Sequence, residues 1–394
     1  GRRRPAPPLP PPPRMAKGVM GVFVDDGRRK GLQSEGARAT VEKALANGGV
    51  APPRAASAAA VSNSKPKKSG WRKGTVIADP STRGSSPKNT ASEGEPPLTL
   101  SQMTFPPCPS SASPTITLLT HSTPQRLHLL PHLCDLYPHP ITLIIHSEEE
   151  YSYAKPAQCG NLKVLYHVSE GPYPVNLLRN ILIRSVETGY YLMIDVDFLP
   201  SSDLYERMEE SLPEEGWATV VPAFETVGNG CEGAECEGRW KDVPRDMDDI
   251  RTRLGKDVRP FQAGNNVGGH STTKSDRWVK REGGTEVIDC FESSRYEPYL
   301  LLPKCERYYD ERFKGYGKNK ISFIQTLRHS GVRFNVLSGA FLTHVEHGKS
   351  KDKRRWEDDE RLHRDVDREY DAFMKEVYSK WGNKPVVKLC HLLR

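Results

Sequence analysis

Tyr190–Pro200, YYLMIDVDFLP, is the stretch of sequence that decides the fold. Its first part, Tyr190–Ile194, is short, continuous and rich in aromatic and branched residues, which predicts a buried strand. Asp195 and Asp197 follow where this strand ends. Buried carboxylates carry a heavy desolvation cost unless a cation pairs with them. The stretch therefore predicts a buried strand that delivers two acids to the edge of a sheet.

Two carboxylates at positions i and i+2 of a strand end can turn toward one hard cation. A leaving group made of phosphate needs such a cation, so Asp-X-Asp after an apolar strand indicates nucleotide-sugar chemistry. Solvated Asp pairs also end strands without any function, and the tripeptide alone leaves both interpretations open.

Strands and helices alternate on the N-terminal side of this stretch. The expected strands are Ile116–Leu119, Ile141–Ile145 and Leu162–Val168, and the expected helices are Pro124–Tyr137 and Val175–Val186. This alternation predicts an α/β fold with a mainly parallel central sheet. In open sheets of this kind the ligand lies beyond the carboxyl ends of the strands, which is where Asp195 and Asp197 would be.

The first 112 residues differ in composition from the rest of the chain. Residues 1–112 hold 18 Lys and Arg against 7 Asp and Glu, whereas residues 113–394 hold 39 against 43. The first segment also contains 17 of the 33 prolines. We therefore predict a disordered basic region over 1–112 and one folded domain over 113–394. Basic tails can contact nucleic acid or anionic lipid, but this one is nearly free of aromatic residues, which favours a solvated linker and no nucleic-acid partner.

No membrane anchor or targeting segment is visible in the sequence. No apolar stretch reaches the roughly 18 residues that a spanning helix needs. Gly18–Val24 is too short for a signal peptide and two acids follow it directly; Met15 could be the true start. The eight cysteines could form disulfides in a secretory lumen. Cys231 and Cys236 are predicted to be a small disulfide or free thiols, because no second pair lies at zinc spacing.

A second polar region, Tyr308–Lys320 (YYDERFKGYGKNK), precedes the helical run Ile321–Leu327. It places Asp310 and Glu311 before a glycine-rich turn. Capping explains one acid at a helix entrance, but it leaves the turn unexplained.

A third region ends in a histidine. Phe334–Leu337 and Ala340–Thr343 are predicted strands that lead to His344. A lone histidine after a strand usually has a structural role. Together with the Asp-X-Asp stretch, however, it could supply the nitrogen ligand of a Mn²⁺-type site.

These motifs resemble glycosyltransferase family 49. The residues that carry the resemblance are YPVNLLRN and YYLMIDVDFLP, DERFKGYGKNK, and VLSGAFLTHVEH, in matching order between about Thr115 and Cys390. The family includes the glucuronyltransferase domain of LARGE-type enzymes and a β-1,4-glucuronyltransferase. The resemblance implies a GT-A (Rossmann-like) fold, a divalent cation such as Mn²⁺, a UDP-sugar donor, a glycan or glycoprotein acceptor, inversion at the anomeric carbon, and a place in the Golgi lumen.

The resemblance also implies roles for single residues. Asp195 and Asp197 match the metal- and donor-binding Asp-X-Asp, and His344 matches a metal-binding histidine. Asp310 is expected to be the catalytic base, with Glu311 as the second choice. Contacts to the donor are expected from Asn176, Arg179, Asn319 and Lys320, although a structural role stays open for the first two and a solvated position for Lys320.

The sequence thus predicts a metal-dependent inverting glycosyltransferase that moves a sugar, glucuronate in the first instance, from a UDP-sugar to a glycan hydroxyl. A related transferase that uses UDP-xylose or UDP-N-acetylglucosamine is one alternative. A catalytically silent glycan-binding protein of the same fold is another, and the intact Asp195, Asp197, His344 and Asp310 argue against it. A metal-dependent hydrolase would need a further ligand cluster.

Overall fold

The computed structural model describes residues 76–78, 96–106, 113–228, 230–231, 233–236, 238–305 and 307–392. All of them belong to the unit Lys68–Arg394. Most of the predicted disordered region, 1–112, lies outside the described residues.

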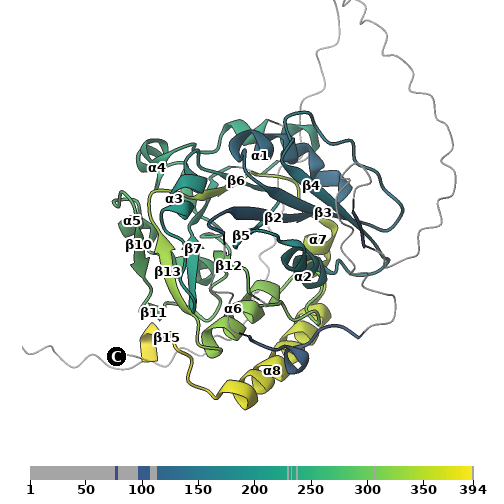
Figure 1. Ribbon diagram of the computed structural model, residues 1–394, viewed down its shortest axis with the longest axis vertical. Coiled ribbons are helices and arrows are strands. Elements are labelled where there is room, and N and C mark those ends of the chain that lie inside the picture. The colour runs from purple at the N-terminus through teal and green to yellow at the C-terminus, as the bar shows by residue number, and fades with distance from the viewer. Residues whose placement is uncertain are drawn as a thin grey trace, which may run out of the picture. The chain divides into compact units, whose positions relative to one another are not determined.

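Within the described residues, the central layer is a nine-stranded sheet (Figure 1). From edge to edge its order is β1 (Val76–Ala78), β4 (Leu162–Val168), β3 (Ile141–Ser147), β2 (Ile116–Ser122), β5 (Tyr190–Asp195), β12 (Tyr299–Pro303), β7 (Trp217–Val221), β13 (Arg333–Leu337) and β10 (Thr285–Val287).

The half of the sheet from β4 to β5 is parallel, as the alternation of strands and helices predicts. Strand β12 then runs antiparallel to both β5 and β7, β13 returns parallel to β7, and the edge strands β1 and β10 are antiparallel to their neighbours. The predicted α/β fold is confirmed, with a parallel half and a mixed half. The chain adds β3 and β4 on one side of β2 and then returns to place β5 on the other side. The carboxyl ends of β2 and β5 therefore lie at a switch point of the sheet, where open α/β sheets bind their ligands.

Helices cover both faces of the sheet (Figure 1). Leu192 and Ile194 of β5 pack into one core together with α1 (Leu130–Leu136). Tyr191 and Met193 pack into a second core with α2 (Val175–Ser185) and α6 (Asn319–His329). Successive side chains of a strand point to opposite faces, so burial on both faces requires the continuous apolar run of β5.

A smaller sheet brings a distant part of the chain to the end of β5. Its order is β6 (Phe198–Pro200), β14 (Leu342–His344), β8 (Ala223–Thr226) and β9 (Val258–Pro260). In the antiparallel pairing of β14 with β6, His344 lies opposite Phe198. The Val345 N–H donates to the Asp197 carbonyl at 2.8 Å. This register places His344 beside the second acid of the Asp-X-Asp stretch.

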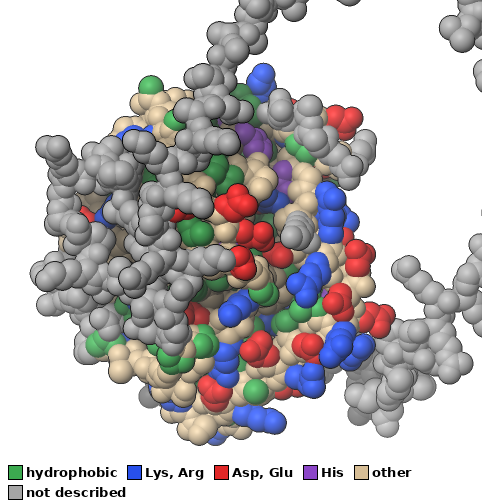
Figure 2. Space-filling view, turned by 90° about the vertical axis from the view of Figure 1, so that its right-hand side faces the viewer, with side chains coloured by type: hydrophobic (Ala, Val, Ile, Leu, Met, Phe, Trp, Pro, Cys, Tyr) green, Lys and Arg blue, Asp and Glu red, His purple; other side chains and the backbone are tan. Residues whose placement is uncertain are grey.

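The remaining elements surround these two sheets. They are the α-helices α3 (Leu204–Glu209), α4 (Met247–Arg253), α5 (Ser275–Trp278), α7 (Lys351–Asp358) and α8 (Glu360–Trp381), the 3₁₀ helices at Leu100–Gln102, Pro124–Leu129, Gly233–Cys236, Arg239–Lys241, Val267–Gly269, Ser271–Thr273 and Cys390–Leu392, and the pair β11 (Cys290–Phe291) and β15 (Lys388–Leu389). None of the described helices is long and apolar enough to cross a membrane. On the face shown in Figure 2, acidic and basic side chains are interspersed.

A short part of the region 1–112 packs on the domain, N-terminal to the predicted boundary at 112. Leu100 and Met103 are buried against Phe373 and Val377 of α8. The Phe105 ring meets the Trp381 ring edge-on at 4.9 Å. Composition averaged over 112 residues hides this short apolar segment, which is long enough to cover one patch of helix α8.

Among the described residues, three disulfides have both partners placed: Cys134–Cys159, Cys231–Cys236 and Cys290–Cys390. The disulfide alternative for Cys231 and Cys236 is therefore the one found. Cys290–Cys390 joins β11 to the residue after β15, across a sequence separation of 100.

Replacing both Cys290 and Cys390 by serine should lower the free energy of unfolding by about 2–5 kcal/mol, because the cross-link restricts a long loop in the unfolded chain. Urea titration followed by circular dichroism measures this change. The matched control replaces Cys231 and Cys236, whose separation is only 5, and should cost less. An equal or larger loss in the control would contradict the loop-entropy explanation.

Candidate active site

A cleft of about 690 Å³ opens at the carboxyl ends of β2 and β5. Both acids of the Asp-X-Asp stretch line it, and so do His344 and the turn Gly315–Lys320 before α6. The cleft walls also include two segments that the sequence did not single out: Gln262–Asn266 and the start of α7 with Lys353 and Trp356.

The Asp195 carboxylate is surrounded by donors from four elements. One oxygen accepts from the Tyr299 hydroxyl at 2.7 Å and from Lys320 Nζ at 3.1 Å. The other lies 3.3 Å from Arg179 Nη2 and 3.5 Å from His121 Nε2. Burial opposes ionisation of Asp195, but Lys320, His121 and Arg179 outweigh it and hold its pKa well below the usual range. Asp195 is therefore a carboxylate whose lone pairs are already occupied by protein donors.

Asp197 lies in a different environment, beside two histidines. His347 Nε2 is 2.7 Å from Asp197 Oδ2 and 3.1 Å from His344 Nε2, and His344 Nε2 is 4.0 Å from the same carboxylate oxygen. One ligand atom from each of the three residues lies within 4.8 Å of the others. Among the described residues, this is the group with the arrangement of a metal site.

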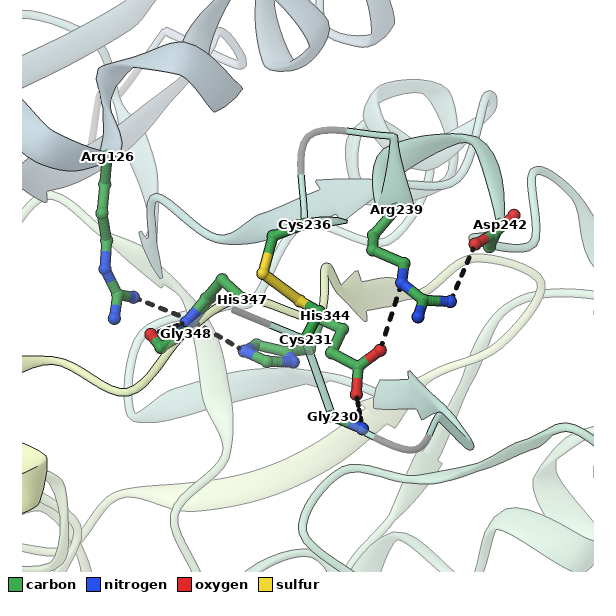
Figure 3. Close-up of a disulfide and its surroundings, with 10 residues drawn as sticks. Arg126, Gly230, Cys231, Cys236, Arg239, Asp242, His344, His347 and Gly348 are labelled. Carbon is green, nitrogen blue, oxygen red and sulfur yellow. Dashed lines mark hydrogen bonds and ion pairs between the residues drawn. A yellow bond between two sulfur atoms is a disulfide. The ribbon is translucent and has the colours of Figure 1, made fainter. Parts of the chain in front are cut away.

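The donor set of this cluster fits a divalent transition-metal ion. One carboxylate oxygen and two imidazole nitrogens suit Mn²⁺ or a similar cation. His347 Nδ1 donates to the Gly348 carbonyl at 2.8 Å (Figure 3), and its Nε2 is the ring atom that faces Asp197. Burial lowers the pKa of His344 to about 4, so this ring is neutral at neutral pH, the form that binds metals.

Arg126 supplies positive charge to the same cluster. Its Nη1 contacts Asp197 Oδ2 and lies 2.8 Å from His347 Nε2 (Figure 3). Burial again opposes ionisation of Asp197, and His347, His344 and Arg126 lower its pKa despite it. A second anion, such as a phosphate, would find this guanidinium at the rim of the cluster.

The segment that carries the two histidines is braced by the disulfide loop. Glu346, between His344 and His347, accepts from the Gly230 N–H at 2.8 Å and pairs with Arg239 Nε at 3.5 Å. Cys231–Cys236 closes this loop (Figure 3). Through Glu346, this cross-linked loop supports the backbone between the two candidate metal-binding histidines.

Of the residues expected to contact the donor, Arg179, Asn319 and Lys320 line the cleft, whereas Asn176 does not. Arg179 Nη1 donates to Asn319 Oδ1 at 2.9 Å and to Asn176 Oδ1 at 3.2 Å. Asn176 is fully buried and donates to the Asp310 carbonyl at 2.7 Å. Asn176 thus holds Arg179 and the loop at Asp310 in place from outside the cleft, which is the structural alternative that the sequence left open.

Asp310 and Glu311, expected to be catalytic, do not line the cleft. Asp310 is 2% exposed, pairs with Arg312 through both carboxylate oxygens and accepts from the Leu100 N–H at 2.9 Å. Glu311 accepts from the Leu98 N–H and from Asn180 Nδ2, at 2.9 and 2.8 Å. These contacts tie the segment at 98–103 to the domain, and in this structure neither acid faces the cleft, where a base would meet the acceptor hydroxyl.

Asp195 was expected to bind metal, and it lies outside the three-residue cluster. Sequence reasoning missed His347 and Arg126, which complete it. The spacing His344-Val-Glu-His347 was a usable signal, because two histidines three residues apart beside an Asp-X-Asp strand are a plausible ligand pair. Arg126 carried no comparable signal, because it lies in an ordinary 3₁₀ turn after β2.

An α/β domain with an Asp-X-Asp strand, a carboxylate–histidine cluster and basic side chains in one cleft has the features of a nucleotide-sugar-dependent transferase. Residues 154–382, more than half of the chain, match the family described as "Glycosyl-transferase for dystroglycan". The chain belongs to this family, and the expected GT-A fold class is confirmed with it.

Curated relatives agree with this assignment. The chain is 31% identical over 284 residues to xylosyl- and glucuronyltransferase LARGE2 of Mus musculus, which covers 65% of this chain and 39% of the relative. The Homo sapiens LARGE2 is 31% identical over 260 residues, with 61% and 34% covered. The chain thus spans less than half the length of these relatives. A solved structure, S. aureus TarS 1–349 in complex with UDP, matches at 12% identity and a TM-score of 0.32, covering 60% of this chain and 62% of that one.

Replacing His347 with alanine should weaken Mn²⁺ binding about tenfold or more, because one imidazole nitrogen of the cluster is lost. Isothermal titration calorimetry of the full chain with MnCl₂ measures the Kd. The control is His128→Ala, an exposed histidine outside the cleft, which should leave the Kd unchanged. Equal Mn²⁺ affinity in wild type and His347→Ala would remove His347 from the ligand set.

Asp310→Asn should act on stability and leave the chemistry in place. Loss of charged hydrogen bonds to Arg312 and Leu100 should cost about 1.5–3 kcal/mol in urea unfolding, while turnover by the folded protein stays within about threefold. Asp365→Asn, on the exposed face of α8, is the control for both readouts. A hundredfold loss of turnover at unchanged stability would restore Asp310 as a catalytic residue.

Proposed function

We propose that this chain is a metal-dependent inverting glycosyltransferase that moves glucuronate from its UDP-linked donor to a hydroxyl of a glycan acceptor. One observation carries the proposal. The cluster of Asp197 with two histidines and the Asp195 carboxylate, which is paired with basic side chains, line one cleft at the switch point of an α/β sheet. Family membership supports the reaction class, and the names of the relatives support the choice of glucuronate or xylose.

The residues divide the work of binding the donor. Asp197, His344 and His347 would hold the divalent ion, and a metal in that position neutralises the negative charge that develops on departing UDP. Arg126, at the edge of the cluster, is placed to pair with a phosphate oxygen. Arg179 and Lys320 are fixed by Asp195 and Asn319, so their positive charge is oriented before the donor binds.

The disulfides and the family also bear on location. Three disulfides among the described residues suit an oxidising compartment. We include the Golgi lumen in the proposal on this ground, with a glycan or glycoprotein as the acceptor.

UDP release by the full chain tests the proposal, with UDP-glucuronate, UDP-xylose and UDP-N-acetylglucosamine, each in Mn²⁺ or EDTA. Release from UDP-glucuronate in Mn²⁺ alone is expected. Asp197→Asn should reduce it about a hundredfold or more, because the cluster loses its anionic ligand. Asp248→Asn, whose side chain is 95% exposed, is the control. Folded wild-type protein that releases UDP from none of the three donors would contradict the proposal.

A further inference from the structure

Glu297 is an acidic residue of the cleft that lies outside the candidate metal cluster. It lines the same cleft as Asp195 and Lys320. Its own N–H donates to the Gly269 carbonyl at 2.9 Å, which anchors the backbone just before β12. Two residues later, Tyr299 contacts both Asp195, at 2.7 Å, and Lys320, at 3.2 Å. Glu297 therefore reaches the cleft directly beside the start of β12.

Glu297 differs from its neighbours in how its carboxylate is paired. Four other acids of the cleft are engaged: Asp195 with Lys320, Asp197 with His347, Glu225 with Arg259 at 2.7 Å, and Asp367 with Lys318 at 3.2 Å. Within the described part of the chain, the Glu297 carboxylate has no hydrogen bond and no ion pair at 4.0 Å or less. Its lone pairs are therefore free to accept a proton from a bound molecule.

Asp352 is the remaining acid of the cleft, and it faces a different end. Its electrostatic neighbours are His146 and Tyr173, beside the ends of β3 and β4. Those of Glu297 are Lys320, Arg179 and Asp195. Asp352 also lies in the first turn of α7, where an acid is favoured by the helix dipole. Of these two acids, Glu297 is the one on which the charges of Asp195, Lys320 and Arg179 act.

The surroundings of Glu297 make its carboxylate a stronger proton acceptor. Burial raises its pKa, and Lys320 and Arg179 oppose this rise only in part. Glu297 is a half-buried, unpaired carboxylate that lines a cleft, and such a group has the properties of a catalytic base.

We propose that Glu297 is the general base of the transfer reaction, an assignment that rests on the proposed function. A Glu297 carboxylate oxygen takes the proton of the acceptor hydroxyl. The acceptor oxygen forms its bond to the anomeric carbon while the bond from that carbon to the UDP oxygen breaks, and the electron pair of that bond stays on the β-phosphate. Attack from the face opposite to UDP inverts the anomeric configuration.

Glu297→Gln in the full chain tests this assignment with two readouts. The first is UDP release from UDP-glucuronate in Mn²⁺ with water as the acceptor, since water also gives up a proton as it attacks. We expect this turnover to fall about a hundredfold or more. The second is the Kd of UDP in Mn²⁺ by calorimetry, which should stay within about threefold because the nucleotide does not need the base.

Three results would overturn the assignment. Glu297→Gln could keep turnover within about threefold of wild type, or it could lose UDP affinity in proportion to turnover. The third is that Asp352→Asn loses turnover while Glu297→Gln stays active. Glu369→Gln is the matched control. Glu369 is a half-buried acid of α8 outside the cleft, whose pKa burial also raises, and its variant should behave as wild type. If wild-type protein turns over none of the three UDP-sugars, the proposed function itself is contradicted. This outcome is distinct from any difference between the variants.

Discussion

Two carboxylates two residues apart at the end of β5, Asp195 half-buried and Asp197 buried, are the constraint on which the rest of this structure depends. Each must be compensated by positive charge or hydrogen bonds, because an isolated buried carboxylate is too costly. Asp195 accepts hydrogen bonds from side chains of α2, α6 and β12, namely Arg179, Lys320 and Tyr299. Asp197 lies beside two histidines from the end of β14 and the segment after it, and it pairs with Arg126 from the turn after β2. Five parts of the chain thus converge on one short stretch, and the cleft lies between them.

The acidic residues of this domain have different roles, and the groups around each carboxylate determine its role. Asp197 faces ligand atoms and is open to a cation, whereas Asp195 is surrounded by fixed donors and orients them. Asp310 and Glu311, in a motif that looks catalytic, hold the backbone of the segment at 98–103. Residue type and motif alone therefore do not identify a catalytic acid. The groups that pair with its carboxylate oxygens must also be known.

Local patterns predicted the parallel half of the sheet well. The expected strand Leu162–Val168 has the bounds of β4, and the expected helix Val175–Val186 differs from α2 by one residue, because periodicity and burial are local properties. Nothing local showed that β12 inserts antiparallel beside β5. The sequence could not show that Arg312, two residues away, occupies the Asp310 carboxylate, or which side of this loop faces the cleft. His347 and Glu297 depended on contacts across many residues, such as the register of β14 on β6.

The position of a bound Mn²⁺ ion tests the central claim most directly. A crystal of the full chain, grown with UDP and Mn²⁺, would give an anomalous difference map at the manganese edge. This account predicts one strong peak within coordination distance of Asp197, His344 and His347, with UDP phosphate oxygens completing the shell. A peak on Asp310 and Glu311 or on another group of acids, with Asp197 still paired to Arg126, would contradict it.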